Sequence, residues 1–127
     1  METSSPLDAI TQLVTAMNAH DLKTAMTLFE PGASFVMKPG VVVSGTAGIH
    51  QALESFMALK PMLTIDAQQV VQAGDVAQYC AKWSIRGVDP TGTAIQLGGR
   101  SSSILRRQPD GQWLFLVDNP WGTEIVG

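Results

Sequence analysis

The chain has 127 residues, of which 45% are apolar and 15% charged, and its net charge at neutral pH is −3. This composition excludes a disordered tail and predicts a single packed domain over residues 1–127. The eight basic residues are scattered, which excludes a phosphate-binding stripe, and no apolar run approaches the roughly 18–20 residues of a membrane span. We therefore expect a cytoplasmic protein that binds neither nucleic acid nor membrane.

Cysteine and histidine are too few for a disulfide or a structural metal site. Cys80 is the only cysteine, and His20 and His50 are the only histidines. An internal disulfide needs two cysteines, and zinc sites use more Cys and His ligands than this chain offers. We therefore predict no bound metal.

Two short helices are expected at the start of the chain. Ser5 is a suitable N-cap, Pro6 suits the first helical position, and the apolar spacing that follows predicts a helix to about residue 18. Asp21 predicts the N-cap of a second helix with an apolar face that includes Phe29. The pair at residues 31–32, Pro-Gly, is expected to end that helix.

A small hairpin and a third helix are expected next. Residues 34–37 and 41–43 have β-forming composition and flank a Lys-Pro-Gly turn, which predicts a pair of short strands. Thr46 is the expected cap of a third helix, with apolar residues on one side. The Lys-Pro step at residues 60–61 is expected to end it.

The rest of the chain reads as an antiparallel meander. Turn sequences separate four strands, at about residues 62–72, 76–87, 93–107 and 112–119. The third of these would extend roughly 45–50 Å if straight, at ~3.3 Å per residue, which is too long for a small domain. We therefore predict a bulge or bend at Gly98-Gly99, and a sheet with a concave inner face.

Alternation predicts which side chains occupy that inner face. In the second long strand, alternate residues are apolar, and we expect them to face the helices: Ala77, Tyr79, Ala81, Trp83 and Ile85. The last strand is apolar on both faces, so a second subunit is expected to cover its outer side. This predicts a homodimer.

Both the order of elements and several short words resemble the NTF2-like superfamily, which includes the SnoaL-like and ketosteroid-isomerase-like domains. The matching words are MNAHDL at residues 17–22, LFEPGA at 28–33, SGTAGI at 44–49, DGQW at 110–113 and DNPW at 118–121. The resemblance implies an α+β fold in which three N-terminal helices pack on a strongly bent, mostly antiparallel sheet, forming a cone around an apolar pocket. Fold alone does not fix function.

The acids of the steroid isomerase mechanism are missing from this sequence. That chemistry needs a carboxylate base, a tyrosine and a protonated acid. Met37 or Lys38 stands where the resemblance places the base, Leu13 where it places the tyrosine, and roughly Ser103 where it places the second acid. Isomerisation by that mechanism is therefore not expected.

Asp118 is the strongest candidate for a catalytic base. It ends the most apolar strand, where partial desolvation raises the pKa of a carboxyl group toward the working range of a base. SnoaL-like cyclases resemble this arrangement, with an aspartate base on the last strand. The structural alternative is that Asp118 bonds to the backbone or caps the turn into Pro120.

Other residues are candidates for the pocket, each with a structural alternative. Arg100 could hold a developing anion or could pair with a surface acid. Tyr79 could donate to a bound carbonyl or pack in the core, and His50 could be a general acid or a solvated helix residue. The remaining candidates for substrate binding are Trp83, Phe35, Met57, Phe115 and Asn119.

Two kinds of function fit these residues. The first is a SnoaL-like enzyme that performs cofactor-free proton transfer on a small apolar molecule, as in cyclisation, isomerisation, dehydration or hydrolysis. The second is a non-catalytic ligand-binding or dimerisation domain with the same fold. Whether Asp118, Arg100 or Tyr79 points into a cavity distinguishes them.

Overall fold

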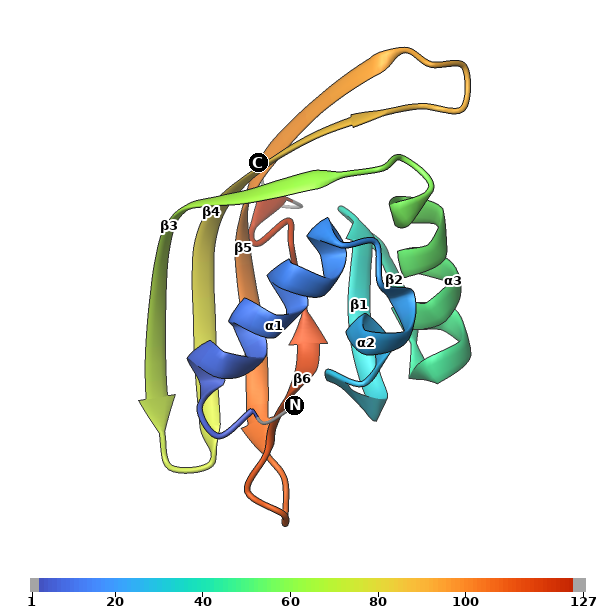
Figure 1. Ribbon diagram of the computed structural model, residues 1–127. Helices are drawn as coiled ribbons and strands as arrows, with labels where there is room; N and C mark the ends of the chain where they lie inside the picture. Colours follow the sequence, from blue (N-terminus) through green and yellow to red (C-terminus); the bar gives the residue numbers. More distant parts are fainter. Residues whose placement is uncertain (1–2, 125–127) are drawn as a thin grey trace.

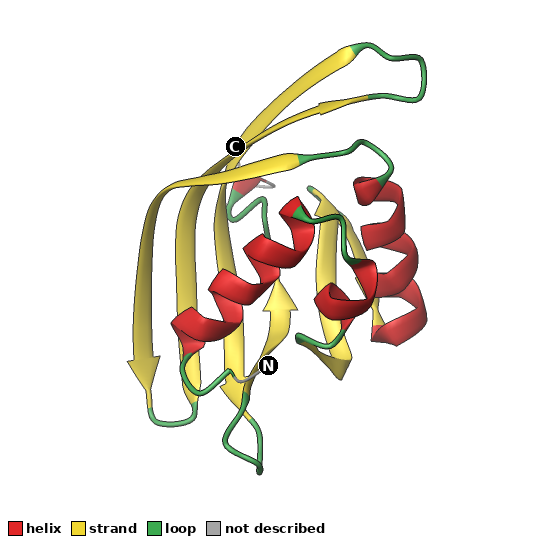
Figure 2. Cartoon of the chain, viewed as in Figure 1, coloured by secondary structure: helices red, strands yellow, loops and turns green. Residues whose placement is uncertain are grey.

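Six strands form one curled sheet, and three helices lie on its concave side (Figures 1 and 2). The computed structural model describes residues 3–124. The sheet order is β2-β1-β6-β5-β4-β3; β1 and β6 are parallel, and every other neighbouring pair is antiparallel. The elements are α1 (Pro6–Asn18), α2 (Leu22–Met26), β1 (Phe29–Lys38), β2 (Val41–Ser44), α3 (Gly45–Met57), β3 (Met62–Ala73), β4 (Val76–Val88), β5 (Ala94–Arg107) and β6 (Trp113–Asp118). The α+β class with a bent, mostly antiparallel sheet is confirmed.

The caps predicted for the first two helices are present. The Ser5 hydroxyl accepts a hydrogen bond from the Asp8 amide at 3.1 Å, and the Asp21 carboxylate accepts one from the Thr24 amide at 3.1 Å. Each bond satisfies an amide that the first helical turn leaves unpaired. Asp21 itself has a lowered pKa, because Thr24 donates to its charged form.

The second helix ends earlier than predicted. Phe29 belongs to β1 and pairs with Phe115 on β6, with ring centroids 5.5 Å apart. The β1–β6 register shifts between Phe29 and Ser34, so the Pro-Gly step lies in an irregular stretch of strand and does not end a helix. The free energy gained by burying two aromatic rings against each other exceeds the gain from the extra turn of helix that the pattern predicted.

The third helix also begins at a different residue. Its N-cap is Ser44, and no side chain caps its first turn. The Ser44 hydroxyl instead bonds to the Ser34 hydroxyl across the β1–β2 pair, at 2.8 Å. The predicted cap, Thr46, therefore lies inside the helix.

A bulge at Gly98-Gly99, one of the two forms that the predicted bend could take, is absent. The β4–β5 pairing runs unbroken through Gly98 and Gly99, so there is no bulge at the glycine pair. The register shift lies in β3, between Ile65 and Ala67. Because Ile65 pairs with Trp83 and Trp83 pairs with Gly99, this bulge and the glycine pair lie on one line across the sheet.

The inner face of the sheet carries the core. All five β4 residues predicted to face the helices are buried, which confirms the alternation. On β6, Trp113 and Phe115 are buried, whereas Leu114 and Leu116 are only half-buried, and the homodimer predicted through this outer face stays a prediction. Within residues 3–124, no helix combines the length and the apolarity needed to span a bilayer.

Candidate functional site

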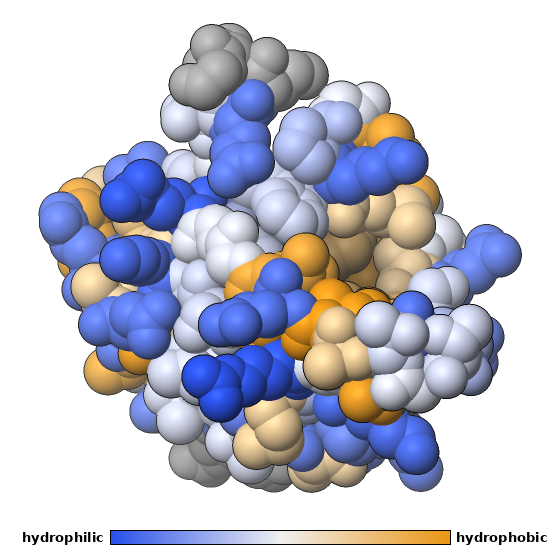
Figure 3. Space-filling view, turned by 90° about the horizontal axis from the view of Figure 1, so that it is seen from above, coloured by the Kyte–Doolittle hydropathy of each residue, from blue (hydrophilic) through white to orange (hydrophobic). Residues whose placement is uncertain are grey.

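An apolar cavity lies between the concave face of the sheet and helices α1 and α3. Its volume is about 350 Å³, near the lower end of the range for small-molecule sites. Met37 and Leu97 line it and remain 40% and 39% exposed, so the cavity opens to solvent beside them. Figure 3, which views the molecule from above, shows apolar side chains gathered around a hollow.

Five of the residues proposed from the sequence meet on the wall of this cavity. They come from three different strands, β1, β4 and β6: Phe35, Tyr79, Trp83, Phe115 and Asp118. Asp118 is the only acidic residue among the described residues of the wall. The site is therefore a mostly apolar cavity whose described wall carries one carboxyl group.

Asp118 occupies the last position of β6, where the strand leaves the core. Its Oδ1 accepts a hydrogen bond from the Ser103 hydroxyl on the neighbouring strand, at 3.1 Å. Burial raises the pKa of this carboxyl group from 3.8 to about 6, although the Ser103 bond lowers it. A carboxyl group with this pKa is largely ionised at neutral pH and can still accept a proton readily.

Ser103 fixes the position of this carboxyl group. Its residue is 1% exposed, and its hydroxyl oxygen also accepts a bond from the Asn119 amide at 3.0 Å. The hydroxyl proton is therefore directed at Asp118, while the oxygen holds the turn that follows β6. Asp118 faces the cavity, and its side chain bonds to the Ser103 side chain, not to the backbone or the turn into Pro120 that the structural alternative named.

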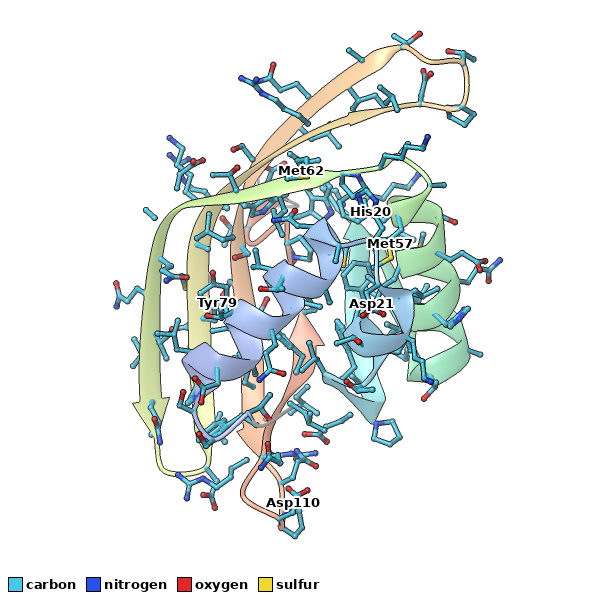
Figure 4. The ribbon with its side chains drawn as sticks, in the orientation of Figure 1. His20, Asp21, Met57, Met62, Tyr79 and Asp110 are labelled. Atoms are coloured by element: carbon cyan, nitrogen blue, oxygen red, sulfur yellow. The ribbon has the colours of Figure 1, made fainter. Side chains whose placement is uncertain are left out.

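The Tyr79 hydroxyl group is already engaged. It donates to the Gln68 side-chain oxygen at 3.0 Å, on the adjacent strand β3. Burial, with a smaller effect from the Asp118 charge, raises the pKa of Tyr79 to about 12. Figure 4 shows Tyr79 on β4, on the face that α1 covers. The ring forms cavity wall, and its hydroxyl group is satisfied by the protein.

Two tryptophans, one on β4 and one in the turn after β6, line the cavity side by side. Trp83 is 6% exposed, and its indole nitrogen donates to the Pro120 carbonyl at 2.6 Å. Its ring meets that of Trp121 edge to face, with centroids 5.3 Å apart. The Trp121 nitrogen donates to the Met37 carbonyl at 3.0 Å, which ties this turn to β1.

Four of the proposed site residues lie outside the cavity wall. Arg100 is exposed and pairs with Lys82 on β4. Because the neighbours of Lys82 in the strand, Ala81 and Trp83, face inward, Lys82 and Arg100 both lie on the outer side of the sheet. The expectation that Arg100 reaches the pocket is therefore wrong. In the other three, helix phase or local bonding keeps the side chain off the wall: His50, Met57 and Asn119.

His50 and Met57 both belong to α3. His50 is exposed, because the face of α3 that meets the cavity carries Ala52, Leu53 and Phe56. Met57, labelled in Figure 4, is half-buried and packs against the core instead of the cavity. Asn119 donates to the Gly122 carbonyl at 3.0 Å, so its side chain holds the turn.

Most of the cavity wall was not predicted from the sequence, and three of the unpredicted residues bear on the chemistry of the site. Ser101 and Ser103 lie on the inner face of β5, opposite Ala81 and Tyr79, and Trp121 lines the cavity from the turn after β6. Gly99, Ser101 and Ser103 alternate along the strand and pair with inner residues of β4, but this register is visible only in the structure, so no sequence signal marked the two serines. Among residues 3–124, no group of three His, Cys, Asp or Glu side chains is arranged to hold a metal ion.

The SnoaL-like domain family matches residues 10–115 of this chain. Solved structures with the same fold include an NTF2-like superfamily protein from Salmonella enterica, at 21% identity, with 93% of this chain and 90% of that one covered and a TM-score of 0.79. None of the curated protein sequences matches this chain.

Two further structures carry functional descriptions. One is a candidate dehydratase of the NTF2-like family from Streptomyces avermitilis, at 22% identity, covering 87% of this chain and 88% of that one, with a TM-score of 0.75. The other is a candidate calcium/calmodulin-dependent protein kinase II association domain from Xanthomonas campestris, at 17% identity, covering 91% and 83%, with a TM-score of 0.78. At these identities the structures share the fold alone. The family model covers most of the chain, and the chain belongs to the SnoaL-like domain family.

Proposed function

We propose that this protein is a cofactor-free enzyme that moves a proton on a small apolar substrate, with Asp118 as the general base. The observation that carries the proposal is the placement of one carboxyl group in an otherwise apolar cavity, where burial raises its pKa to about 6. A general base works best when its pKa lies near the working pH. The candidate dehydratase from Streptomyces avermitilis, which shares the fold, supports this class of reaction.

The step that this geometry favours is removal of a proton from carbon beside a carbonyl group. A C–H bond breaks, its electron pair forms the enolate double bond, and the proton moves to a carboxylate oxygen of Asp118. Return of that proton to another carbon would give isomerisation. In dehydration, the enolate electrons would form a C=C bond as the C–O bond to a neighbouring hydroxyl breaks, and the proton on Asp118 would pass to the departing oxygen to form water. Ser103 acts through Asp118, since its bond holds the carboxyl group in place, and is a positioning residue.

Hydrogen–deuterium exchange tests the proton transfer without knowledge of the natural substrate. The probe is 1-indanone, a bicyclic ketone, dissolved in D₂O, and proton NMR follows the loss of its α-hydrogen signal. We expect the protein to accelerate exchange, with a rate that rises as pH increases through about 6. Asp118→Asn should remove most of that acceleration, because a general base contributes about 10²- to 10⁴-fold.

A surface acid provides the matched control. Glu54 is exposed on α3 and does not line the cavity, so Glu54→Gln should exchange at the wild-type rate. Exchange by Asp118→Asn at the wild-type rate would contradict the proposal. Saturable binding of 1-indanone without any acceleration between pH 5 and 9 would also contradict it.

The second candidate function is non-catalytic binding or assembly. It is favoured by the Tyr79 hydroxyl, which bonds to Gln68 and so leaves the wall without a free phenol for an oxyanion. The association domain that shares the fold, together with the half-buried leucines on the outer face of β6, supports assembly as a homodimer. Sedimentation equilibrium at micromolar concentration tests this, and a monomer would rule it out.

A further inference from the structure

Nearly every polar side chain on the cavity wall is engaged by another group of the protein. The Tyr79 hydroxyl donates to Gln68, the Trp83 nitrogen to Pro120, and the Trp121 nitrogen to Met37. Ser103 donates to Asp118 and accepts from the Asn119 amide. These groups are not free to recognise a ligand.

Ser55, which also lines the cavity, is exposed on α3, so among the buried polar side chains of the wall the exception is Ser101. Its Oγ is buried and has no hydrogen-bond partner among residues 3–124, and the residue lines the cavity. The other buried side-chain atom without a partner in this part of the chain, Oδ1 of Asn119, is not on the cavity wall. Buried hydroxyl groups are nearly always bonded, so an unpaired one in a residue that lines a cavity calls for a physical reason.

Ser101 sits at the centre of the site. Along the inner face of β5, Gly99 lies against the Trp83 ring, Ser101 follows opposite Ala81, and Ser103 bonds to Asp118. Ser101 and Ser103 are two residues apart on one strand, so their Cα atoms are separated by roughly 6–7 Å. A ligand that reaches both Ser101 and Asp118 therefore needs only the length of one or two rings.

The protein packs closely behind Ser101. A Cβ added to Gly122 would lie 2.4 Å from the Arg100 carbonyl oxygen and 3.8 Å from the Ser101 carbonyl carbon, so the turn after β6 is pressed against this strand. The Ser102 amide donates to the Asn119 carbonyl at 2.9 Å, which holds the turn there. Rotation about χ1 moves the Ser101 hydroxyl between staggered positions and can direct it toward the cavity.

We propose that Ser101 is the hydrogen-bond donor that recognises the ligand, and that the ligand is an apolar molecule of one or two rings with one acceptor oxygen at Ser101. Serine offers one O–H donor, and the cavity supplies apolar contact around it. The inference rests on the proposed function only in that the cavity binds a small molecule. Proton transfer at Asp118 is not needed for it.

Paired probes test the assignment. Indane and 1-indanone share a bicyclic carbon skeleton and differ by one carbonyl oxygen, and isothermal titration calorimetry gives the dissociation constant of each. One neutral hydrogen bond corresponds to about a two- to tenfold preference, so the wild-type protein should bind 1-indanone tighter than indane by that factor. Ser101→Ala should abolish the preference and leave indane binding unchanged or stronger.

Ser102→Ala is the matched control, since Ser102 is the next residue on β5 and points to the opposite face. It should keep the preference for 1-indanone. Ser101→Cys keeps the shape and has a weaker donor, so it should show a reduced preference, and it decides the question if the alanine variant does not fold. An unchanged preference in both Ser101 variants, no preference in the wild type, or no binding of either probe would overturn the proposal.

A measurement on Asp118→Asn separates this inference from the proposed function. That variant should lose proton exchange and still prefer 1-indanone, because Ser101 is intact. Preference without exchange in the wild type would contradict the enzyme and support the Ser101 assignment. Exchange in the wild type with an unchanged preference in Ser101→Ala would support the enzyme and contradict the Ser101 assignment.

Discussion

Replacing Gly99 with alanine should disrupt the wall of the cavity. A Cβ at this position would lie 2.8 Å from Cζ2 and 3.1 Å from Cε2 of the Trp83 indole, distances that real Cβ atoms do not tolerate without movement. Gly99 has no positive φ, so the effect is steric and not a matter of backbone strain. The glycine is there to leave room for a tryptophan ring.

The indole cannot move aside without loss. Trp83 is 6% exposed, donates to the Pro120 carbonyl at 2.6 Å, and packs against the Trp121 ring. Overpacking a core costs about 1–3 kcal/mol, and losing a hydrogen bond costs about 1 kcal/mol more. We therefore expect Gly99→Ala to lower the free energy of unfolding by about 2–4 kcal/mol and to weaken 1-indanone binding.

Urea denaturation followed by tryptophan fluorescence measures this loss, and two other glycines are its controls. A Cβ at Gly98 would meet only the Trp83 carbonyl oxygen, at 3.3 Å, so Gly98→Ala should cost less. A Cβ at Gly32 would meet nothing within 4 Å. If Gly99→Ala were as stable as both controls, the assignment of this glycine to the Trp83 ring would be wrong.

Four further predictions follow from single contacts. Asp118→Asn removes the cost of burying a charged carboxylate. The pKa of Asp118 is raised from 3.8 to about 6, which corresponds to about 3 kcal/mol in the free energy of unfolding. The wild type should gain this stability relative to the variant as pH falls through 6 toward 4, and lose it as pH rises again. Urea titrations of both proteins at pH 4 and pH 8 measure it, and a pH-independent difference would refute it. Ser103→Ala removes the bond that lowers the Asp118 pKa, so the low-pH limb of the exchange profile should move to higher pH, and a limb that stays in place would show that Ser103 does not act through Asp118. Glu30 is 8% exposed and bonds to Arg106 and Gln108, and the Arg106 bond is the largest cause of its lowered pKa. Glu30→Gln should lose about 1–3 kcal/mol at pH 7, and the difference should shrink as pH falls below 4.5; an equal loss at pH 3 in urea titrations would argue against the ion pair. Asn18 bonds to both the amide and the carbonyl of Leu63, at 2.6 and 3.0 Å, so Asn18→Ala should lower the free energy of unfolding by about 1–3 kcal/mol, and an unchanged thermal midpoint would contradict this.

The inner face of the sheet could be predicted because it depends on local pattern. Alternation along β4 places Tyr79 and Trp83 inward whatever the partner strand, and side-chain caps such as Asp21 satisfy amides only three residues away. The order of the elements came from such local patterns, and together with the matching words it indicated the family. These features need no knowledge of long-range contacts.

The facing of Arg100 could not be predicted for a physical reason. Gly98 and Gly99 carry no side chains, and the serines that follow are polar on both faces, so the alternation of β5 loses its phase. The partner of Asp118 was hidden for a related reason, because the β5–β6 register shifts between Ile104 and Leu105. Such a shift depends on packing and has no short-range signature.

Long-range bonds were equally inaccessible. Glu30 is buried against Arg106, whose guanidinium lies 2.5 Å from its carboxylate across 76 residues of sequence, and no short-range pattern indicates this pair. The outward facing of His50 could have been predicted, because the apolar spacing of α3 places its cavity face at Leu53 and Phe56.

The carboxyl carbon of Asp118, followed by NMR from pH 3 to pH 9, tests the central claim most directly. Comparison with Asp118→Asn assigns the signal. If the carboxyl group is buried in an apolar cavity and poised as a base, it should titrate near pH 6. A titration near its ordinary value of 3.8 would show a solvated carboxylate and contradict the account.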